Sequence, residues 1–228
     1  MKLSVIIPAY NEESTILDMV QRVRACGVPS LQLIIVNDCS DDGTREKLDS
    51  LPASDDLTIV HHERNQGKGA AIRTAQELVT GDVMVIQDAD LEYSPEEFPR
   101  LLKPIEDDTA DVVYGSRYSG TEILVDSFWH YVGNKVITTF SNMLANINLT
   151  DMETCYKMIR ADIFKDLTLE CSKFGIEPEL TAKLARRGCR IYEVPISYNA
   201  RRFDEGKKIN WRDGVAAFWY IVKYNLLD

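Results

Sequence analysis

Three acidic side chains, Asp88, Asp90 and Glu92, follow one apolar segment and could share a divalent cation. Residues 83–86 are Val-Met-Val-Ile, and this composition predicts a buried strand. In a strand that continues into a turn, residues two apart point to the same side, and the three carboxylates repel one another without a positive charge. Mg²⁺ and Mn²⁺ prefer such oxygen ligands and also hold phosphates. The alternative is a solvated acidic turn before a helix that starts near Pro95.

The segments that must position these acids alternate between strand and helix. Strands are predicted at residues 3–7, 31–36, 57–60, 83–86 and 111–114, with helices that start near residues 11–14, 44, 67 and 95. This alternation predicts an α/β fold, in which a mostly parallel, Rossmann-like sheet has helices on both faces. Ligands bind beyond the carboxyl ends of such strands. Polar residues follow four of the strands: Tyr10 to Glu12, Asn37 and Asp38, Arg64 and Asn65, and Asp88 to Asp90.

The second half of the chain has a different character. Helices are predicted at residues 127–146, 178–187 and 213–227, and short strands at 157–160 and 190–195. The first and last of these helices carry broad apolar faces with several aromatic residues. We expect these faces to contact a membrane surface, to pack in the core or to form an interface between subunits of a homo-oligomer. The sequence contains no repeat or obvious linker, so a single domain over residues 1–228 is expected.

The composition argues against several classes of function. The 228 residues carry a net charge of −10, which disfavours a nucleic-acid partner and a polybasic contact with anionic lipid. The five cysteines are odd in number and lack C-x-x-C spacing, which is typical of a reducing compartment. The first residues do not resemble a signal peptide, and the apolar runs are shorter than the about 20 residues that span a bilayer. We therefore expect a cytoplasmic location.

Two common nucleotide-binding loops are absent from the sequence. Gly67-Lys-Gly69 lacks the length of a Walker loop and its hydroxyl residue. The first strand is followed by Pro-Ala-Tyr-Asn at residues 8–11 instead of G-x-G-x-x-G, which excludes a dinucleotide-dependent dehydrogenase. Lys68 is expected either to contact a phosphate or to be exposed at the start of a helix. What remains is a sheet whose carboxylates hold a diphosphate through a metal ion.

Five segments occur in a characteristic order: Val5-Ile-Ile-Pro-Ala-Tyr-Asn-Glu12, Val36-Asn-Asp-Cys-Ser-Asp-Asp-Gly-Thr44, Asn65-Gln-Gly-Lys-Gly69, Gln87-Asp-Ala-Asp90 and Gly115-Ser-Arg117. Together they resemble the inverting glycosyltransferases of family 2, which have the GT-A fold. Within that family the chain is most similar to the dolichol-phosphate mannose synthase and polyprenyl-phosphate sugar synthase group. The resemblance covers most of the chain, and it implies a nucleotide-sugar-binding half at residues 1–118 and an acceptor-side half at residues 119–228.

The resemblance implies a metal-dependent, inverting transfer of a sugar from a GDP- or UDP-sugar to a polyprenyl or dolichyl phosphate. Mg²⁺ or Mn²⁺ is the implied cofactor, and Asp88, Asp90 and Glu92 are its implied ligands, although mannose synthases often have Gln at the position of Glu92. Arg117 matches an arginine that meets a phosphate near the reacting centre, and its alternative role is to pair with a structural acid. The resemblance assigns the nucleotide sugar to these residues: Pro8, Tyr10, Glu12, Asp38, Asp88, Ala89, Asp90 and Lys208.

The acceptor is expected to bind to the second half, where Asp151 matches an Asp that begins the family's acceptor loop. A lipid phosphate is an anionic nucleophile that needs no general base, but its approach to a second phosphate requires positive charge. Arg201 with Lys207, or Arg202 with Lys208, matches the mobile loop that closes over the donor, and the first pair is preferred. Gly206 lies farther from either arginine than in mannose synthases, and the alternative is a plain surface loop. The expected catalytic residues are therefore Asp90, Arg117, Arg201 and Lys207.

Two other functions are compatible with the same residues. A family 2 enzyme could act on the hydroxyl of a saccharide or protein, with Asp151 or Glu177 as the general base. A nucleotide-sugar-binding or regulatory subunit could retain the fold without catalysis, but a site that has lost its function has no physical reason to keep so much charge. For a lipid acceptor, we expect peripheral contact with the cytoplasmic face of a membrane, or a membrane partner.

Overall fold

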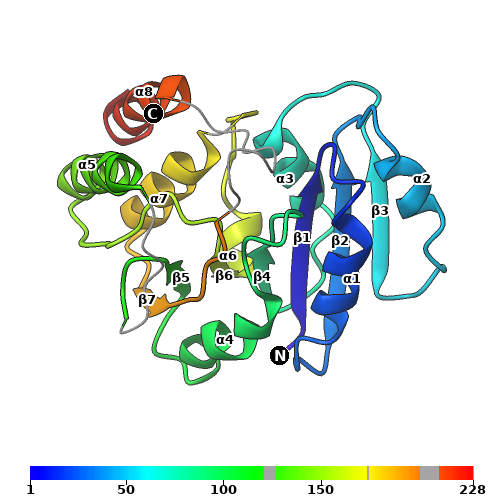
Figure 1. Ribbon diagram of the computed structural model, residues 1–228. Helices are drawn as coiled ribbons and strands as arrows, with labels where there is room; N and C mark the ends of the chain where they lie inside the picture. Colours follow the sequence, from blue (N-terminus) through cyan, green and yellow to red (C-terminus); the bar gives the residue numbers. More distant parts are fainter. Residues whose placement is uncertain (121–126, 174, 201–210, 228) are drawn as a thin grey trace.

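The computed structural model describes residues 1–120, 127–173, 175–200 and 211–227. Its centre is a seven-stranded sheet with the order β3-β2-β1-β4-β6-β5-β7 (Figure 1). The strands are β1 (Leu3–Ala9), β2 (Leu31–Asn37), β3 (Leu57–His61), β4 (Val83–Ile86), β5 (Val112–Ser116), β6 (Lys157–Arg160) and β7 (Ile191–Pro195). The helices are α1 (Ile16–Arg24), α2 (Thr44–Asp49), α3 (Lys68–Gln76), α4 (Phe98–Glu106, after the 3₁₀ turn Pro95–Glu97), α5 (Phe128–Ala145), α6 (Ala161–Lys165), α7 (Ile176–Arg186) and α8 (Trp211–Val222, followed by the π-helical segment Lys223–Leu227).

The predicted mostly parallel sheet is confirmed, with one exception. Strand β6 is antiparallel to both of its neighbours, β4 and β5, so the second half of the chain supplies a central strand of the sheet. The predicted end of the first strand at Pro8 is wrong, because β1 continues through Pro8 to Ala9. A proline is tolerated there because β4 ends at Ile86, opposite Ile6, and the last residues of β1 pair only with β2.

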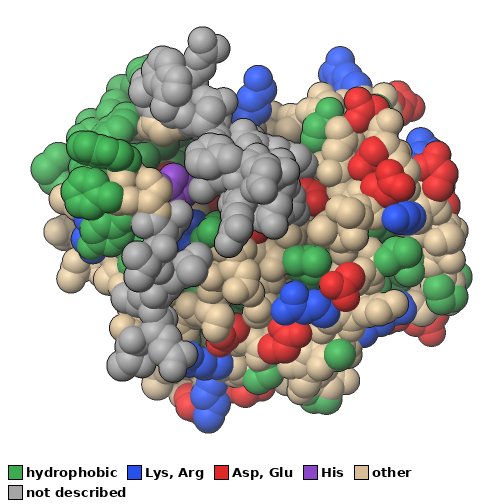
Figure 2. Space-filling model, viewed as in Figure 1, with side chains coloured by type: hydrophobic (Ala, Val, Ile, Leu, Met, Phe, Trp, Pro, Cys, Tyr) green, Lys and Arg blue, Asp and Glu red, His purple; other side chains and the backbone are tan. Residues whose placement is uncertain are grey.

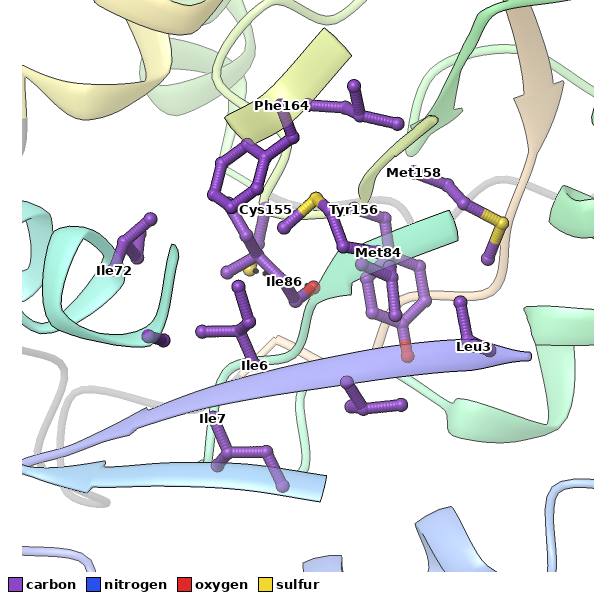
Figure 3. Packing of buried hydrophobic residues seen from close by; sticks show 14 of the residues in the cluster. Leu3, Ile6, Ile7, Ile72, Met84, Ile86, Cys155, Tyr156, Met158 and Phe164 are labelled. Carbon is purple, nitrogen blue, oxygen red and sulfur yellow. Dashed lines mark hydrogen bonds between the residues drawn. The ribbon is translucent and has the colours of Figure 1, made fainter. Parts of the chain in front are cut away.

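The core is built from strands whose residues are buried on both faces of the sheet. Strands β4 and β5 are buried throughout, as are nearly all residues of β1 and β2, which explains why these segments are continuously apolar in sequence. Figure 3 shows side chains from β1, α3, β4, β6 and α6 in contact across this core. The same hydrophobic cluster runs from Leu3 to Ile221, so both halves of the chain contribute to it.

Helices α5, α7 and α8 contact one another on one side of the molecule (Figure 1). The rings of Phe140 in α5 and Phe218 in α8 are 5.4 Å apart, so part of each predicted apolar face is core packing. Trp129 and Trp219 are nevertheless 77% and 59% exposed, and hydrophobic side chains gather on the surface around α5 (Figure 2). Among the described residues, no helix has the length and apolar character to cross a bilayer.

Candidate active site

A cavity of about 570 Å³ lies beyond the carboxyl ends of β1, β2 and β4. Residues that follow these strands line it together with side chains of α5, α7 and α8, so segments far apart in the sequence meet here. Among the residues that were predicted to bind the nucleotide sugar, all those that the structure describes line the cavity: Pro8, Tyr10, Glu12, Asp38, Asp88, Ala89 and Asp90. Glu92, Arg117 and Glu177 also line it, whereas Asp151 lies behind the wall. Arg201, Arg202, Lys207 and Lys208 lie outside the described residues.

The turn after β4 carries the acids that were predicted to share a metal ion. Leu91 has a φ of 62°, in the left-handed region, and it turns the chain between Asp90 and Glu92. Asp90 Oδ1 accepts a hydrogen bond from the Glu92 N–H at 3.2 Å, and the Glu92 carboxylate accepts one from the Tyr198 hydroxyl at 2.7 Å. The strand therefore passes into a turn, as expected, and Asp90 and Glu92 both line the cavity. Within the described ranges, no three His, Cys, Asp or Glu side chains are grouped as a metal site.

Lys68 bridges two carboxylates in the cavity wall. Its ammonium lies 2.8 Å from Asp88 Oδ1 and 2.9 Å from Glu177 Oε1. Burial alone would raise the pKa of Asp88, but the adjacent ammonium outweighs burial and lowers it. The same two carboxylates raise the pKa of Lys68 well above its usual value, against the effect of burial. The expectation of an exposed lysine at the helix start is wrong, and this cation instead holds the acids of β4 and α7 together.

Asp38 organises the loop that precedes α3. Its carboxylate accepts hydrogen bonds from the backbone N–H groups of Gln66 and Gly67, at 2.9 and 2.6 Å, and it lies 2.7 Å from His62 Nδ1. The residue was predicted to lie near the nucleotide base, and it does line the cavity. Its carboxylate oxygens, however, are engaged by the loop, so Asp38 shapes this end of the cavity through residues 65–69.

Arg117 is held by a buried acid, which was its alternative role. Its guanidinium donates two hydrogen bonds to Asp151, at 2.6 and 2.8 Å, and the same carboxylate accepts one each from the Arg117 backbone N–H and Asn134, both at 3.2 Å. Asp151 is 0% exposed. Burial would raise the pKa of Asp151, but the Arg117 guanidinium outweighs it and lowers the pKa. A carboxylate held in its ionised form by a bidentate arginine is a poor general base.

Several cavity residues were not singled out from the sequence. Glu153 and Cys155 line the cavity from the connection before β6, and Tyr93 and Tyr198 line it beside the turn after β4. The two tyrosine rings are 5.2 Å apart, and the Arg117 guanidinium lies 5.2 Å from the centre of the Tyr198 ring. The one available signal was the pair of acids at positions 151 and 153, directly before a predicted strand.

Gly67 shapes the start of α3, where the backbone comes close to residues 171–173. Its φ is 95°, and a Cβ atom at this position would lie 2.3 Å from the Ser172 carbonyl oxygen. We expect Gly67→Ala to lower the free energy of unfolding by about 2 kcal/mol or more, through backbone strain and this clash. Urea unfolding measures the effect.

Gly133→Ala is the matched control, because Gly133 lies inside α5 with nothing within 4 Å of the added Cβ. This change is expected to raise the free energy of unfolding by about 0.5–1 kcal/mol. Equal stability of the two variants would contradict the prediction for Gly67.

Known proteins resemble this chain over most of its length. Residues 4–168 match the family model for Glycosyl transferase family 2. The chain is 34% identical to an undecaprenyl-phosphate mannosyltransferase from Micrococcus luteus, over 91% of this chain and 87% of that protein. It is 32% identical to a polyprenol monophosphomannose synthase from Mycolicibacterium smegmatis, over 89% and 79% of the two chains. It is 27% identical to a dolichol-phosphate mannosyltransferase from Pyrococcus furiosus, over 91% of this chain but only 59% of that protein.

Solved structures show the same fold. The glucosyl-3-phosphoglycerate synthase from Mycobacterium tuberculosis, crystallised with Mn²⁺, UDP and phosphoglyceric acid, superimposes with a TM-score of 0.72. The two proteins are 18% identical, and the superposition covers 99% of this chain and 78% of that one. The same synthase was also crystallised with Mg²⁺ and UDP. With its strand-end cavity, its family match and these relatives, the chain belongs to glycosyl transferase family 2 and has the GT-A fold.

Proposed function

We propose that this protein transfers a sugar, with inversion, from a GDP- or UDP-sugar to a polyprenyl phosphate. One observation carries the proposal: a single cavity joins the strand-end residues of β1, β2 and β4 to Arg117 and to the apolar helices α5 and α8. The mannosyltransferases among the relatives are named for polyprenyl-type phosphate acceptors, which supports this choice of acceptor.

The donor is expected to extend along the strand ends. Pro8 lies in β1, and Tyr10 and Glu12 follow this strand; all three line the cavity, where we propose that a nucleoside binds beside the loop that Asp38 holds. Asp88 and Asp90 follow β4. We therefore propose that the diphosphate binds at the turn after β4.

The oxygen ligands at the turn after β4 are of the type that Mg²⁺ and Mn²⁺ prefer. Asp88, Asp90 and Glu92 are the candidate ligands, because all three line the cavity at this turn. Oxygen atoms of a bound diphosphate would complete a shell that the protein supplies only in part. The metal, when bound, would supply positive charge that stabilises the leaving diphosphate.

The acceptor phosphate is assigned to Arg117, which the Asp151 carboxylate holds in a fixed orientation. His130 of α5 and Ala217 of α8 line the same cavity. The outer faces of these helices expose Trp129 and Trp219. A phosphate inside the cavity would therefore leave the lipid chain next to an apolar surface, which is where we propose that the protein meets a membrane.

The reaction needs no general base. A phosphate oxygen of the acceptor forms a bond to the anomeric carbon while the bond between that carbon and the diphosphate oxygen breaks on the opposite side. Both the nucleophile and the leaving group are anions, so no proton has to move. The alternative hydroxyl acceptor requires a base, and Asp151 is bound to Arg117 and buried. Arg201 and Lys207 are proposed to neutralise the acceptor and close the site.

Calorimetric titration with GDP and UDP, in Mn²⁺ and in EDTA, tests the donor site. Metal-dependent binding of one nucleotide is expected. The matching labelled nucleotide sugar should then modify a polyprenyl phosphate and leave the corresponding polyprenol, which lacks the phosphate, unmodified. Transfer to the polyprenol or to a soluble saccharide would favour the hydroxyl alternative. Absence of nucleotide binding by the folded protein would favour the non-enzyme alternative.

A further inference from the structure

Two residues that line the cavity each carry a buried carboxylate oxygen without a hydrogen-bond partner among the described residues. These oxygens are Glu153 Oε1 and Glu177 Oε2. Both residues line the cavity, and Glu177 is 7% exposed. Most buried polar atoms in folded proteins have a partner, and an unpaired one costs about 1–3 kcal/mol. Two such atoms on one cavity point to a ligand that carries hydrogen-bond donors.

The surrounding protein fixes both carboxylates in place. The Lys157 ammonium donates hydrogen bonds to the carbonyl oxygens of Met152 and Thr154, at 2.9 and 2.5 Å, and so anchors the residues on either side of Glu153. Glu177 lies in the first turn of α7, and its other oxygen is 2.9 Å from the Lys68 ammonium. Each glutamate thus carries one carboxylate oxygen that has no hydrogen-bond partner among the described residues.

The chemistry of the two carboxylates selects among ligands. A phosphate would be repelled by two acids, and the described residues provide no third acid or histidine with which they could form a metal site. A neutral sugar ring carries several hydroxyl groups, each of which can donate a hydrogen bond to a carboxylate oxygen. A sugar that itself carries a carboxylate would be rejected.

We infer that Glu153 and Glu177 form the end of the donor site that binds the hydroxyl groups of a neutral hexose. This assignment rests on the proposed function and gives a role to two acids that donor transfer itself does not use. Glu177 had been considered as a base for a hydroxyl acceptor, and here it positions the sugar instead. The pair excludes donors with an acidic sugar, such as a uronic acid.

Protonation of Glu153 provides an independent readout. Burial raises its pKa to about 7, with a further increase from Glu177 on α7 and Asp151 in the same connection, against Lys157 on β6 and Arg117 after β5. Sugar hydroxyl groups that donate to the carboxylate favour its ionised form, so binding of the sugar should lower this pKa. Nucleotide-sugar binding is therefore expected to release a proton near pH 7 and to strengthen from pH 6 to pH 8.

The first test compares binding of UDP with UDP-glucose, or GDP with GDP-mannose, in wild type and Glu153→Met. Methionine keeps the length of the side chain and removes both oxygens. The variant is expected to bind the nucleotide sugar about tenfold more weakly and the free nucleotide within about twofold of wild type. Glu177→Gln should also lower the affinity for the nucleotide sugar relative to the affinity for the free nucleotide. Glu96→Gln should leave this ratio of affinities unchanged, because Glu96 is an exposed acid outside the cavity.

Thermal unfolding shows whether the variants are folded, so that weaker binding is not mistaken for unfolding. Replacing an unpaired buried carboxyl by an apolar side chain is expected to leave Glu153→Met at least as stable as wild type. The inference would be overturned if a stable Glu153→Met variant kept the wild-type ratio of affinities for nucleotide sugar and free nucleotide. An equal loss of affinity for both ligands would also overturn it. If the wild type binds neither ligand, the proposed function itself fails, and the inference fails with it.

The second test follows the proton and the charge of the sugar. Calorimetry in buffers of different ionisation enthalpy should detect proton release when wild type binds the nucleotide sugar. Glu153→Gln should bind the nucleotide sugar without this proton release. UDP-glucuronic acid should bind wild type at least about tenfold more weakly than UDP-glucose. Equal affinity for the neutral and acidic sugars would also contradict the assignment.

Discussion

Asp90→Asn is expected to reduce sugar transfer about a thousandfold, which corresponds to several kcal/mol of lost transition-state stabilisation. Asp90 lines the cavity directly after β4, where the proposed metal and diphosphate meet. The asparagine can still accept the hydrogen bond from the Glu92 N–H, so the turn should persist. The loss should therefore fall on metal-dependent nucleotide binding and on turnover, with little change in stability.

Initial rates at saturating donor, together with Mn²⁺-dependent nucleotide binding, measure this effect. Asp18→Asn is the control, because Asp18 is an exposed acid on α1 that does not line the cavity. It should retain full activity. Activity of Asp90→Asn near that of wild type would remove Asp90 from the proposed metal site.

Asp151→Asn is expected to lower the free energy of unfolding by about 3–5 kcal/mol, because it leaves the buried Arg117 guanidinium without a counter-charge. Asp151 is 0% exposed and makes two hydrogen bonds with that guanidinium. Urea unfolding at pH 7 measures the loss. Asp107→Asn is the matched control, since Asp107 pairs with Lys103 on the surface, and such a pair contributes about 1 kcal/mol or less.

The pH dependence of this difference identifies its origin. The pKa of Asp151 is lowered in the folded protein from its ordinary value of 3.8. Its contribution to stability is therefore complete above about pH 4 and is lost as the pH falls through the folded-state pKa. The gap between wild type and Asp151→Asn should shrink below pH 4. A loss of turnover at unchanged stability would instead support Asp151 as a general base.

Local sequence patterns were sufficient to predict the sheet and the strand ends that form the cavity. The continuous apolar runs of β1, β2 and β4 identify strands buried on both faces, because helices cover both sides of a parallel sheet. The polar residues that follow them were expected to meet at one edge, and the structure brings them to one cavity. The motif resemblance also predicted the GT-A fold, which the structural neighbours share.

Local sequence pattern did not indicate the backbone conformation of one turn residue or the direction of one strand. A turn after β4 was expected, but leucine rarely adopts a positive φ, so the conformation of Leu91 gives no signal in the sequence. The segment 157–160 was predicted as a strand, but apolar spacing does not record strand direction, and β6 proved to be antiparallel.

By itself, the sequence determined which segments form strands, which polar residues follow them, and to which family the chain is similar. Only the tertiary structure decided which charges pair: Lys68 with Asp88 and Glu177, and Arg117 with Asp151. The last two residues are 34 positions apart. Secondary structure is encoded by neighbours along the chain, whereas an ion pair or an unpaired oxygen, such as Oε1 of Glu153, depends on which distant segments the topology brings together.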